Sequence, residues 1–106
     1  MEKLWLNIIS NIRNNPTELH TLPKVARQPK WFSVDTDGTY IYISNAKYNV
    51  PSSNLTGTRK LNYNEFTRIY PIYLRRELGE QVSSEAGKAT VNQVYWYAII
   101  HSYCEN

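Results

Sequence analysis

The chain has 106 residues, of which 42% are hydrophobic and 20% charged, and it carries a formal net charge of +3. This length fits one compact domain over residues 1–106 and leaves no room for a second lobe with a deep interdomain cleft, which weighs against a complex enzyme. No apolar run approaches the roughly 20 residues that span a bilayer, so no membrane partner is expected.

An amphipathic helix is predicted at the start of the chain. Asn14, Asn15 and Pro16 end the apolar pattern, because proline disfavours helix in the residue before it. The residues at helical spacing are Leu4, Trp5, Ile8, Ile9 and Ile12. We therefore place a helix over 2–13. The segment 17–30 has two prolines and no sustained period, and we expect an ordered basic loop with at most one helical turn.

The segment 31–44, WFSVDTDGTYIYIS, gives the clearest local signal in the chain. Asp37 and Gly38 are the preferred pair for a two-residue type I′ turn, so the segment is predicted to be a β-hairpin. This register buries one face by pairing Val34 with Ile41 and Phe32 with Ile43. The opposite face is then both polar and aromatic, with Ser33, Asp35, Tyr40 and Tyr42. We also consider a third strand near 48–50.

The next predicted helix lies between Asn62 and Gly79, and both of its ends are marked in the sequence. Asn62 can cap the first turn, and Glu65 three residues later completes a capping-box arrangement. Gly79 supplies a C-terminal stop. Pro71 lies inside this helix, where it removes one backbone hydrogen bond, so we expect the helix to kink or divide there.

The last predicted helix covers 91–103 and follows a polar connection at 80–89. Thr90 and Gln93 form a second capping-box pattern at its start. Its β-branched and aromatic residues would suit a strand equally well, and the cap is what favours the helix. Apolar residues cover most of its circumference, which is typical of a helix buried on several sides. We therefore expect a central helix in an α+β fold, where a small antiparallel sheet packs against two or three helices.

One flank of this last helix has an alternative interpretation. Trp96 and Tyr103 could remain uncovered and contact a second copy of the chain or another protein, because Tyr and Trp are enriched at interfaces. Nine tyrosines and three tryptophans are more rings than a core of this size easily accommodates. Some of these rings are therefore expected at a surface.

Charge is distributed unevenly along the chain. From Arg13 to Arg76 there are ten basic residues against four acidic ones, a local balance of +6. After Arg76 there are four acidic residues against Lys88 alone, a local balance of −3. A basic face with an acidic end indicates an acidic or polyanionic partner.

A binding module is the function that these residues favour. Surfaces rich in arginine and tyrosine are typical of protein interfaces, so a domain that binds a protein partner, as an inhibitor, adaptor or accessory subunit, is the preferred interpretation. The alternative is sequence-nonspecific binding of DNA or RNA, in which cations neutralise phosphates and exposed rings stack on bases. In either case the predicted contact residues are Tyr40, Tyr42, Lys60, Arg68, Arg75, Arg76, Lys24 and Arg27.

A small nuclease-like enzyme is the least favoured interpretation. Such an enzyme needs clustered carboxylates, and the one close pair is Asp35 and Asp37, of which the turn already explains Asp37. The two histidines, His20 and His101, show no spacing typical of a zinc site, and Cys104 cannot form an internal disulfide. We therefore expect a cytoplasmic protein that works without a metal or other cofactor.

Overall fold

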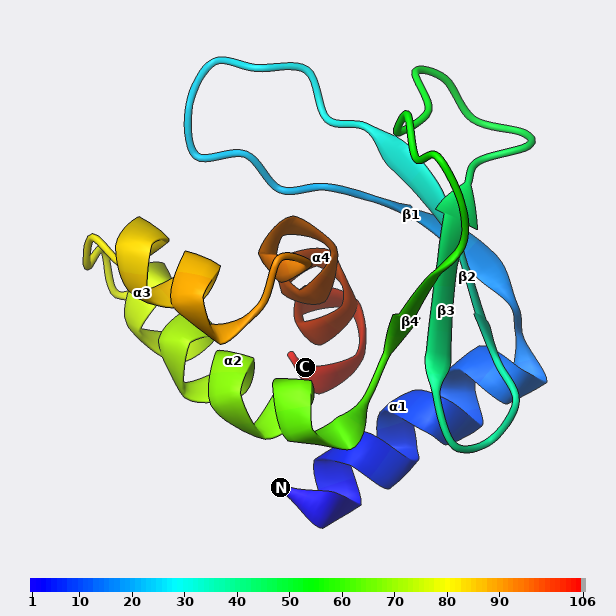
Figure 1. Ribbon diagram of the computed structural model, residues 1–106, viewed down its shortest axis with the longest axis horizontal. Helices are drawn as coiled ribbons and strands as arrows, with labels where there is room; N and C mark the ends of the chain where they lie inside the picture. The colour runs from blue at the N-terminus through cyan, green and yellow to red at the C-terminus, as the bar shows by residue number, and fades with distance from the viewer. Residues whose placement is uncertain (106) are drawn as a thin grey trace.

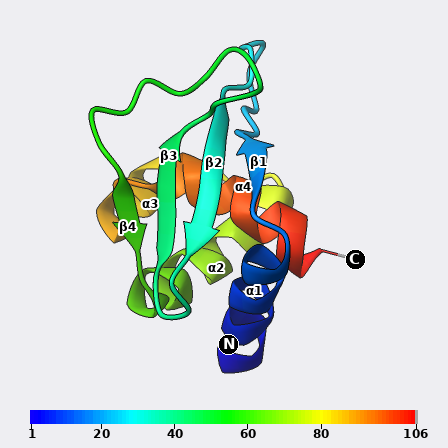
Figure 2. The ribbon, with the colours of Figure 1, turned by 90° about the vertical axis from the view of Figure 1, so that its right-hand side faces the viewer.

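The computed structural model describes residues 1–105 and shows an α+β fold, as predicted (Figure 1). A four-stranded antiparallel sheet in the order β1-β2-β3-β4 packs against the helices; those that follow the sheet in the chain lie behind it in Figure 2, and the first helix lies below it. The elements in chain order are α1 (Glu2–Asn14), β1 (Thr17–His20), β2 (Trp31–Thr36), β3 (Ile41–Asn45), β4 (Arg59–Leu61), α2 (Tyr63–Glu77), α3 (Ser83–Ala89) and α4 (Gln93–Cys104).

Strand β1 lies in a segment predicted to be a loop. Its residues pair with β2, from Thr17 opposite Val34 to His20 opposite Trp31. All of them are half-buried, so apolar and polar side chains do not alternate, and periodicity does not reveal the strand. The remainder of the predicted loop, 21–30, is irregular.

The predicted third strand near 48–50 is wrong. That stretch is a loop, and its Tyr48 and Val50 side chains are 86% and 85% exposed. The Glu18 carboxylate holds this loop, because it accepts hydrogen bonds from three successive backbone amides and one side-chain amide in residues 47–49. Backbone amides that are occupied by a side chain are not free for a strand partner. Strand β4 pairs with β3 instead.

Strands β2 and β3 form the predicted hairpin with a longer connection than a two-residue turn. Thr36 lies opposite Ile41, so four residues, 37–40, join the strands. The predicted register is therefore displaced by two residues, and Val34 lies opposite Ile43. A shift of two residues keeps every side chain on its face, which is why the apolar face is buried as predicted.

The connection is organised by the side chain of Asp37. Its carboxylate accepts hydrogen bonds from the backbone amides of Thr39 and Tyr40 and from the hydroxyl of Tyr42. These bonds, the one from the Tyr40 amide above all, lower the pKa of Asp37 from 3.8 to about 2. Gly38 follows at a φ of 97°, a backbone conformation that favours glycine.

Helix α2 begins at the predicted Asn62 cap and ends before Gly79, as predicted, but the capping box is incomplete because the Glu65 carboxylate accepts a hydrogen bond from the Thr90 hydroxyl instead. The Asn62 side chain accepts a hydrogen bond from the Glu65 amide at 2.9 Å, and Gly79 lies beyond the last turn at a φ of 93°. The helix runs without interruption through Pro71, so it is not divided there. Only one backbone hydrogen bond is lost at a proline, and the packed face of the helix compensates for it.

The segment before the last helix differs from the prediction. It contains the short helix α3, which is mostly polar and buries only Ala86, so no apolar pattern in the sequence indicates it. Helix α4 is a helix, as predicted, but it begins without the predicted capping box. The Thr90 hydroxyl accepts a hydrogen bond from the Asn92 amide and donates one to Glu65, so it is occupied outside the helix.

Helix α4 is the central helix of the hydrophobic core, as predicted. The residues from Tyr95 to Ile100 are all buried. Trp96 is 0% exposed, and its ring centroid lies 6.2 Å from that of Trp5 and 5.8 Å from that of Phe66. These three rings join α1, α2 and α4 into one core.

The Asn62 cap gives a direct test of how α2 is stabilised. Replacing Asn62 with alanine is expected to lower the free energy of unfolding by about 1 kcal/mol, because the Glu65 amide loses its acceptor. Urea unfolding measures the change. Asn64→Ala, at an exposed position in the first turn, is the matched control, and equal midpoints for the two variants would show that the cap contributes nothing.

Candidate functional site

The tyrosines predicted to contact a partner lie on the sheet face opposite the core, but neighbouring side chains cover them. The Tyr42 hydroxyl donates to Asp37 at 2.7 Å, and this hydrogen bond raises the pKa of Tyr42. The Lys60 ammonium lies 3.9 Å from the centroid of the Tyr40 ring. The structure therefore brings three of the predicted contact residues together, and their strongest contacts are local.

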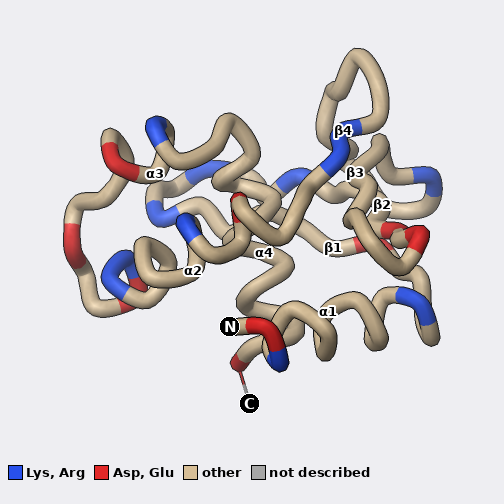
Figure 3. Tube along the Cα trace, turned by 60° about the horizontal axis from the view of Figure 1, so that its bottom comes forward, with Lys and Arg blue, Asp and Glu red and all other residues tan. Residues whose placement is uncertain are grey.

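The arginines of α2 do not join that surface. Arg75 forms ion pairs with Glu80 at 3.0 Å and Glu85 at 2.7 Å, so the acidic end of the sequence neutralises it. Acidic and basic positions lie near one another along the chain around the end of α2 and α3 (Figure 3). Arg68 donates to the backbone carbonyl of Ala89. Helix α2 also lies across the core from the outer face of the sheet (Figure 1). The single contact surface expected from the sequence, arginines and sheet tyrosines together, is therefore not formed.

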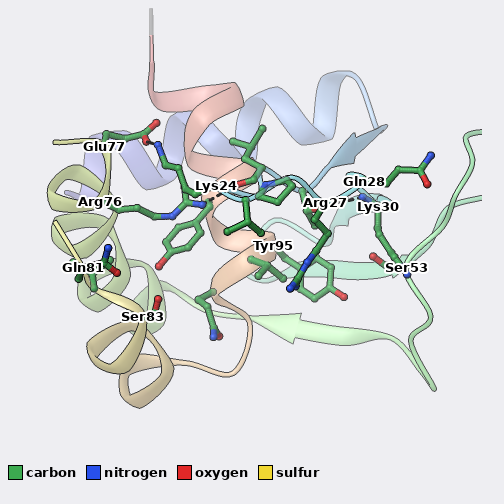
Figure 4. Close-up of a pocket in the computed structure, with 18 of the residues that line it drawn as sticks. Lys24, Arg27, Gln28, Lys30, Ser53, Arg76, Glu77, Gln81, Ser83 and Tyr95 are labelled. Atoms are coloured by element: carbon green, nitrogen blue, oxygen red, sulfur yellow. Dashed lines mark hydrogen bonds and ion pairs between the residues drawn. The ribbon is translucent and has the colours of Figure 1, made fainter. Parts of the chain in front are cut away.

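The sequence did not predict a cleft of about 760 Å³ that the structure shows. It lies beneath the 21–30 loop, above the first turns of α4, and it reaches the C-terminal end of α2 and the start of α3 (Figure 4). Three predicted contact residues, Lys24, Arg27 and Arg76, line it together with Lys30. Four chain segments that are distant in sequence meet here, which is why no local pattern reveals the cleft.

The 21–30 loop is closed at its base and fixed to α2. The Thr21 amide donates to the Lys30 carbonyl, and the Lys30 amide donates to the Thr21 hydroxyl, both at 3.0 Å. Further along the loop, the Arg76 guanidinium donates to the Leu22 carbonyl at 2.7 Å. These contacts anchor the loop at its base, where it borders the cleft.

The floor of the cleft is aromatic and apolar. The Tyr95 ring packs edge-on against Phe32 with the centroids 5.0 Å apart, and the Arg76 guanidinium lies 4.3 Å from the centroid of Tyr97. Burial raises the pKa of Tyr97, and the Arg76 charge opposes this rise. The apolar residues that complete the lining are Leu22, Pro23, Val25, Val82 and Val94.

Basic side chains outnumber acidic ones around the cleft. The charged residues of the lining are Lys24, Arg27, Lys30, Arg76, Glu77 and Glu80. Lys24 is paired with Glu77 at 2.9 Å. Among residues 1–105, neither Arg27 nor Lys30 forms an ion pair, and both are exposed. These two cations are therefore free to meet an anionic ligand.

Trp96 cannot form the alternative interface on α4 in this fold. Trp96 is fully buried, because it fills the space between α1 and α2, and it presents nothing to a partner. Tyr103 is half-buried against the core, and burial raises its pKa. The predicted exposed flank is therefore corrected to a core position for Trp96.

A second group of ionisable side chains lies beside the cleft. Potential metal-binding atoms of Glu77, His101 and Glu105 lie within 4.8 Å of one another. The sequence did not predict this group, because Glu77 comes from α2 and the other two from the end of α4. The carboxylates of the predicted pair, Asp35 and Asp37, accept hydrogen bonds from nearby backbone amides.

Comparisons of the chain with protein-family models, curated proteins and solved structures found no match. None of the helices in residues 1–105 is long and apolar enough to cross a bilayer. A functional proposal for this protein depends on the geometry of its own surface.

Proposed function

We propose that the chain is a non-catalytic binding module, and that the cleft beneath the 21–30 loop binds an acidic segment of a partner protein. The observation that carries this proposal is the placement of Arg27 and Lys30, which form no ion pair within residues 1–105, beside an aromatic and apolar floor. Guanidinium and ammonium groups form charge-assisted hydrogen bonds with carboxylates, which are roughly twice as strong as hydrogen bonds between neutral groups. We also propose a cytoplasmic location, in keeping with the free thiol of Cys104.

The distribution of charge along the cleft favours a peptide of defined direction. Glu77 and Gln81 lie at one end of the lining, and Lys30 and Ser53 lie at the other (Figure 4). Acidic side chains of an extended segment would meet Arg27 and Lys30, and its apolar side chains would cover the valines and tyrosines between the two ends. Complementary charge of this kind fixes register and speeds association.

A nucleic acid fits the same residues less well. Continuous phosphates require a continuous row of cations, whereas Glu77 and Glu80 contribute carboxylates to one end of the cleft. The rings proposed to stack on bases, Tyr40 and Tyr42, are already in contact with Lys60 and Asp37. We therefore favour an acidic peptide as the ligand.

The anchored base of the 21–30 loop also lowers the conformational cost of binding. Backbone and hydroxyl hydrogen bonds between Thr21 and Lys30 hold the base of this loop, and Arg76 holds the adjacent Leu22, so these residues lose little conformational freedom when a ligand enters. The Tyr95 and Tyr97 rings are likewise held by packing. The floor of the cleft and the base of the loop are therefore in place before a ligand binds.

The test uses a fluorescein-labelled peptide that alternates glutamate with leucine and serine, and fluorescence anisotropy at low and physiological salt. The double variant Arg27→Ala with Lys30→Ala is expected to weaken binding by about threefold to thirtyfold, because each exposed ion pair contributes up to about 1 kcal/mol. The dependence of affinity on salt should also become shallower.

The control variant Lys3→Ala with Lys88→Ala removes the same charge from exposed positions outside the cleft, and it should retain the affinity of the natural chain. If both double variants lose the same affinity for the peptide, the effect comes from net charge alone, and the cleft is not the binding site. A thymidine oligonucleotide serves as a second probe. Tighter binding of the oligonucleotide than of the peptide, lost in the cleft variant, would assign the cleft to nucleic acid instead.

A further inference from the structure

The end of α2 and the end of α4 place one imidazole and two carboxylates side by side. His101 and Glu105 are one helical turn apart, and the His101 Nδ1 atom lies 3.2 Å from the Glu105 Oε2 atom. Glu77 is the last residue of α2, and all the ligand atoms of this group lie within 4.8 Å of one another. Small rotations of exposed side chains are therefore enough to bring them around one ion.

A buried hydroxyl connects the two helices at this point. Tyr73 is 1% exposed, and its hydroxyl donates to the Glu77 Oε1 atom at 3.1 Å and lies 3.5 Å from the His101 Nδ1 atom. The Tyr73 ring is held by the core, so the hydroxyl fixes the relative position of Glu77 and His101. Outer hydrogen bonds of this kind orient the ligands of metal sites.

We propose that Glu77, His101 and Glu105 bind a divalent transition-metal ion, with Zn²⁺ as the ion that the ligand set fits best. An imidazole nitrogen suits zinc, whereas calcium and magnesium prefer oxygen ligands alone. Two carboxylates balance the charge of the ion. Zinc has no geometric preference from its d electrons, and three protein ligands leave a coordination position for water. The site is exposed, so the ion has free access.

Lys24 competes with the metal for Glu77. Its ammonium lies 2.9 Å from the Glu77 Oε2 atom, and it must leave this position when a cation takes the same carboxylate. Removing Lys24 should therefore strengthen metal binding. A Lys24 variant is therefore expected to bind the metal more tightly, whereas a variant that lacks one of the three ligands should bind it more weakly.

The experiment is calorimetric titration of the full chain with ZnCl₂ in a buffer without chelators. His101→Ala is expected to lower the affinity at least about tenfold, Glu105→Gln should also lower it, and Lys24→Met should raise it. The matched control is His20→Ala, which removes the other histidine of the chain and should leave the affinity within about twofold of the natural value. Circular dichroism checks the fold of each variant, and His101 is half exposed, so its loss leaves the core intact.

Three results would overturn the proposal. They are no detectable binding by the natural chain at millimolar ZnCl₂, unchanged affinity in both His101→Ala and Glu105→Gln, and loss of binding in Cys104→Ser. The last result would assign the ion to the neighbouring thiol, which is half-buried against the core. An affinity that falls in the two ligand variants and rises in Lys24→Met supports the site as described.

Discussion

Replacing Trp96 with alanine is expected to lower the free energy of unfolding by about 3–5 kcal/mol. Trp96 is the largest of the fully buried side chains, and its ring contacts Trp5 and Phe66 from two other helices. Truncation leaves a cavity at the point where α1, α2 and α4 meet. Because domains of this size are stable by only about 5–15 kcal/mol, much of the total is lost. Urea unfolding followed by circular dichroism measures the change.

Two further variants show whether the loss comes from packing. Trp96→Phe is expected to cost less, because it keeps a ring and removes an indole N–H that has no hydrogen-bond partner among residues 1–105. Tyr48→Ala, at a side chain that is 86% exposed, should change stability by no more than about 0.5 kcal/mol. A folded Trp96→Ala chain of natural stability and altered oligomeric state would restore the interface interpretation.

Replacing Glu18 with glutamine is expected to release the 47–49 loop and to remove a pH-dependent part of the stability. Burial of the Glu18 carboxylate raises its pKa, but the hydrogen bonds from the Lys47 amide, the Asn49 side chain and the Tyr48 and Asn49 amides outweigh this effect. The pKa falls from 4.5 to about 2 as a result. The folded state therefore favours the ionised carboxylate more strongly than the unfolded chain does.

The sign of the pH dependence follows from this lowered pKa. The stabilisation by Glu18 is complete above pH 4.5, decreases as the pH falls, and is lost below a pH of about 2. Thermal unfolding of the natural chain and of Glu18→Gln should therefore differ at pH 6 and converge near pH 2. Amide hydrogen exchange at residues 47–49 should accelerate in the variant at neutral pH, by about tenfold or more.

Glu2→Gln is the control for this experiment, since Glu2 is exposed in the first turn of α1. It should unfold like the natural chain across the whole pH range. A constant difference between the natural chain and Glu18→Gln from pH 6 to pH 2 would mean that the effect comes from side-chain shape and not from the carboxylate charge.

The parts of the fold that could be predicted are those determined by residues close together in the sequence. Asn62 and Gly79 mark the ends of α2 within a few residues of the helix itself. The apolar face of the hairpin was also predicted correctly, although its register was not, because alternation fixes the face and the turn fixes the pairing. The turn depends on the Asp37 side chain, which the dipeptide rule for Asp37 and Gly38 does not consider.

The parts that were missed depend on contacts between distant residues. Strand β1 forms because β2 is available as a partner, and the 47–49 loop has its shape because Glu18, some 30 residues earlier, accepts its amides. The cleft depends on distant residues even more, since four separate segments line it and none of them contains a recognisable motif. The distribution of charge in the sequence correctly indicated Lys24, Arg27 and Arg76 as surface cations, but it does not show that Glu80 and Glu85 pair with Arg75 in the fold.

The two edges of the sheet bear on how the protein behaves at high concentration. Strand β1 has four residues and β4 has three, and β1 is half-buried along its length, where it packs against α4. The unpaired amides and carbonyls of an edge strand can form hydrogen bonds with a strand of another molecule. A short edge strand forms few such bonds, so the added strand is bound weakly. The chain is therefore expected to resist edge-to-edge aggregation, even at the concentrations that calorimetry requires.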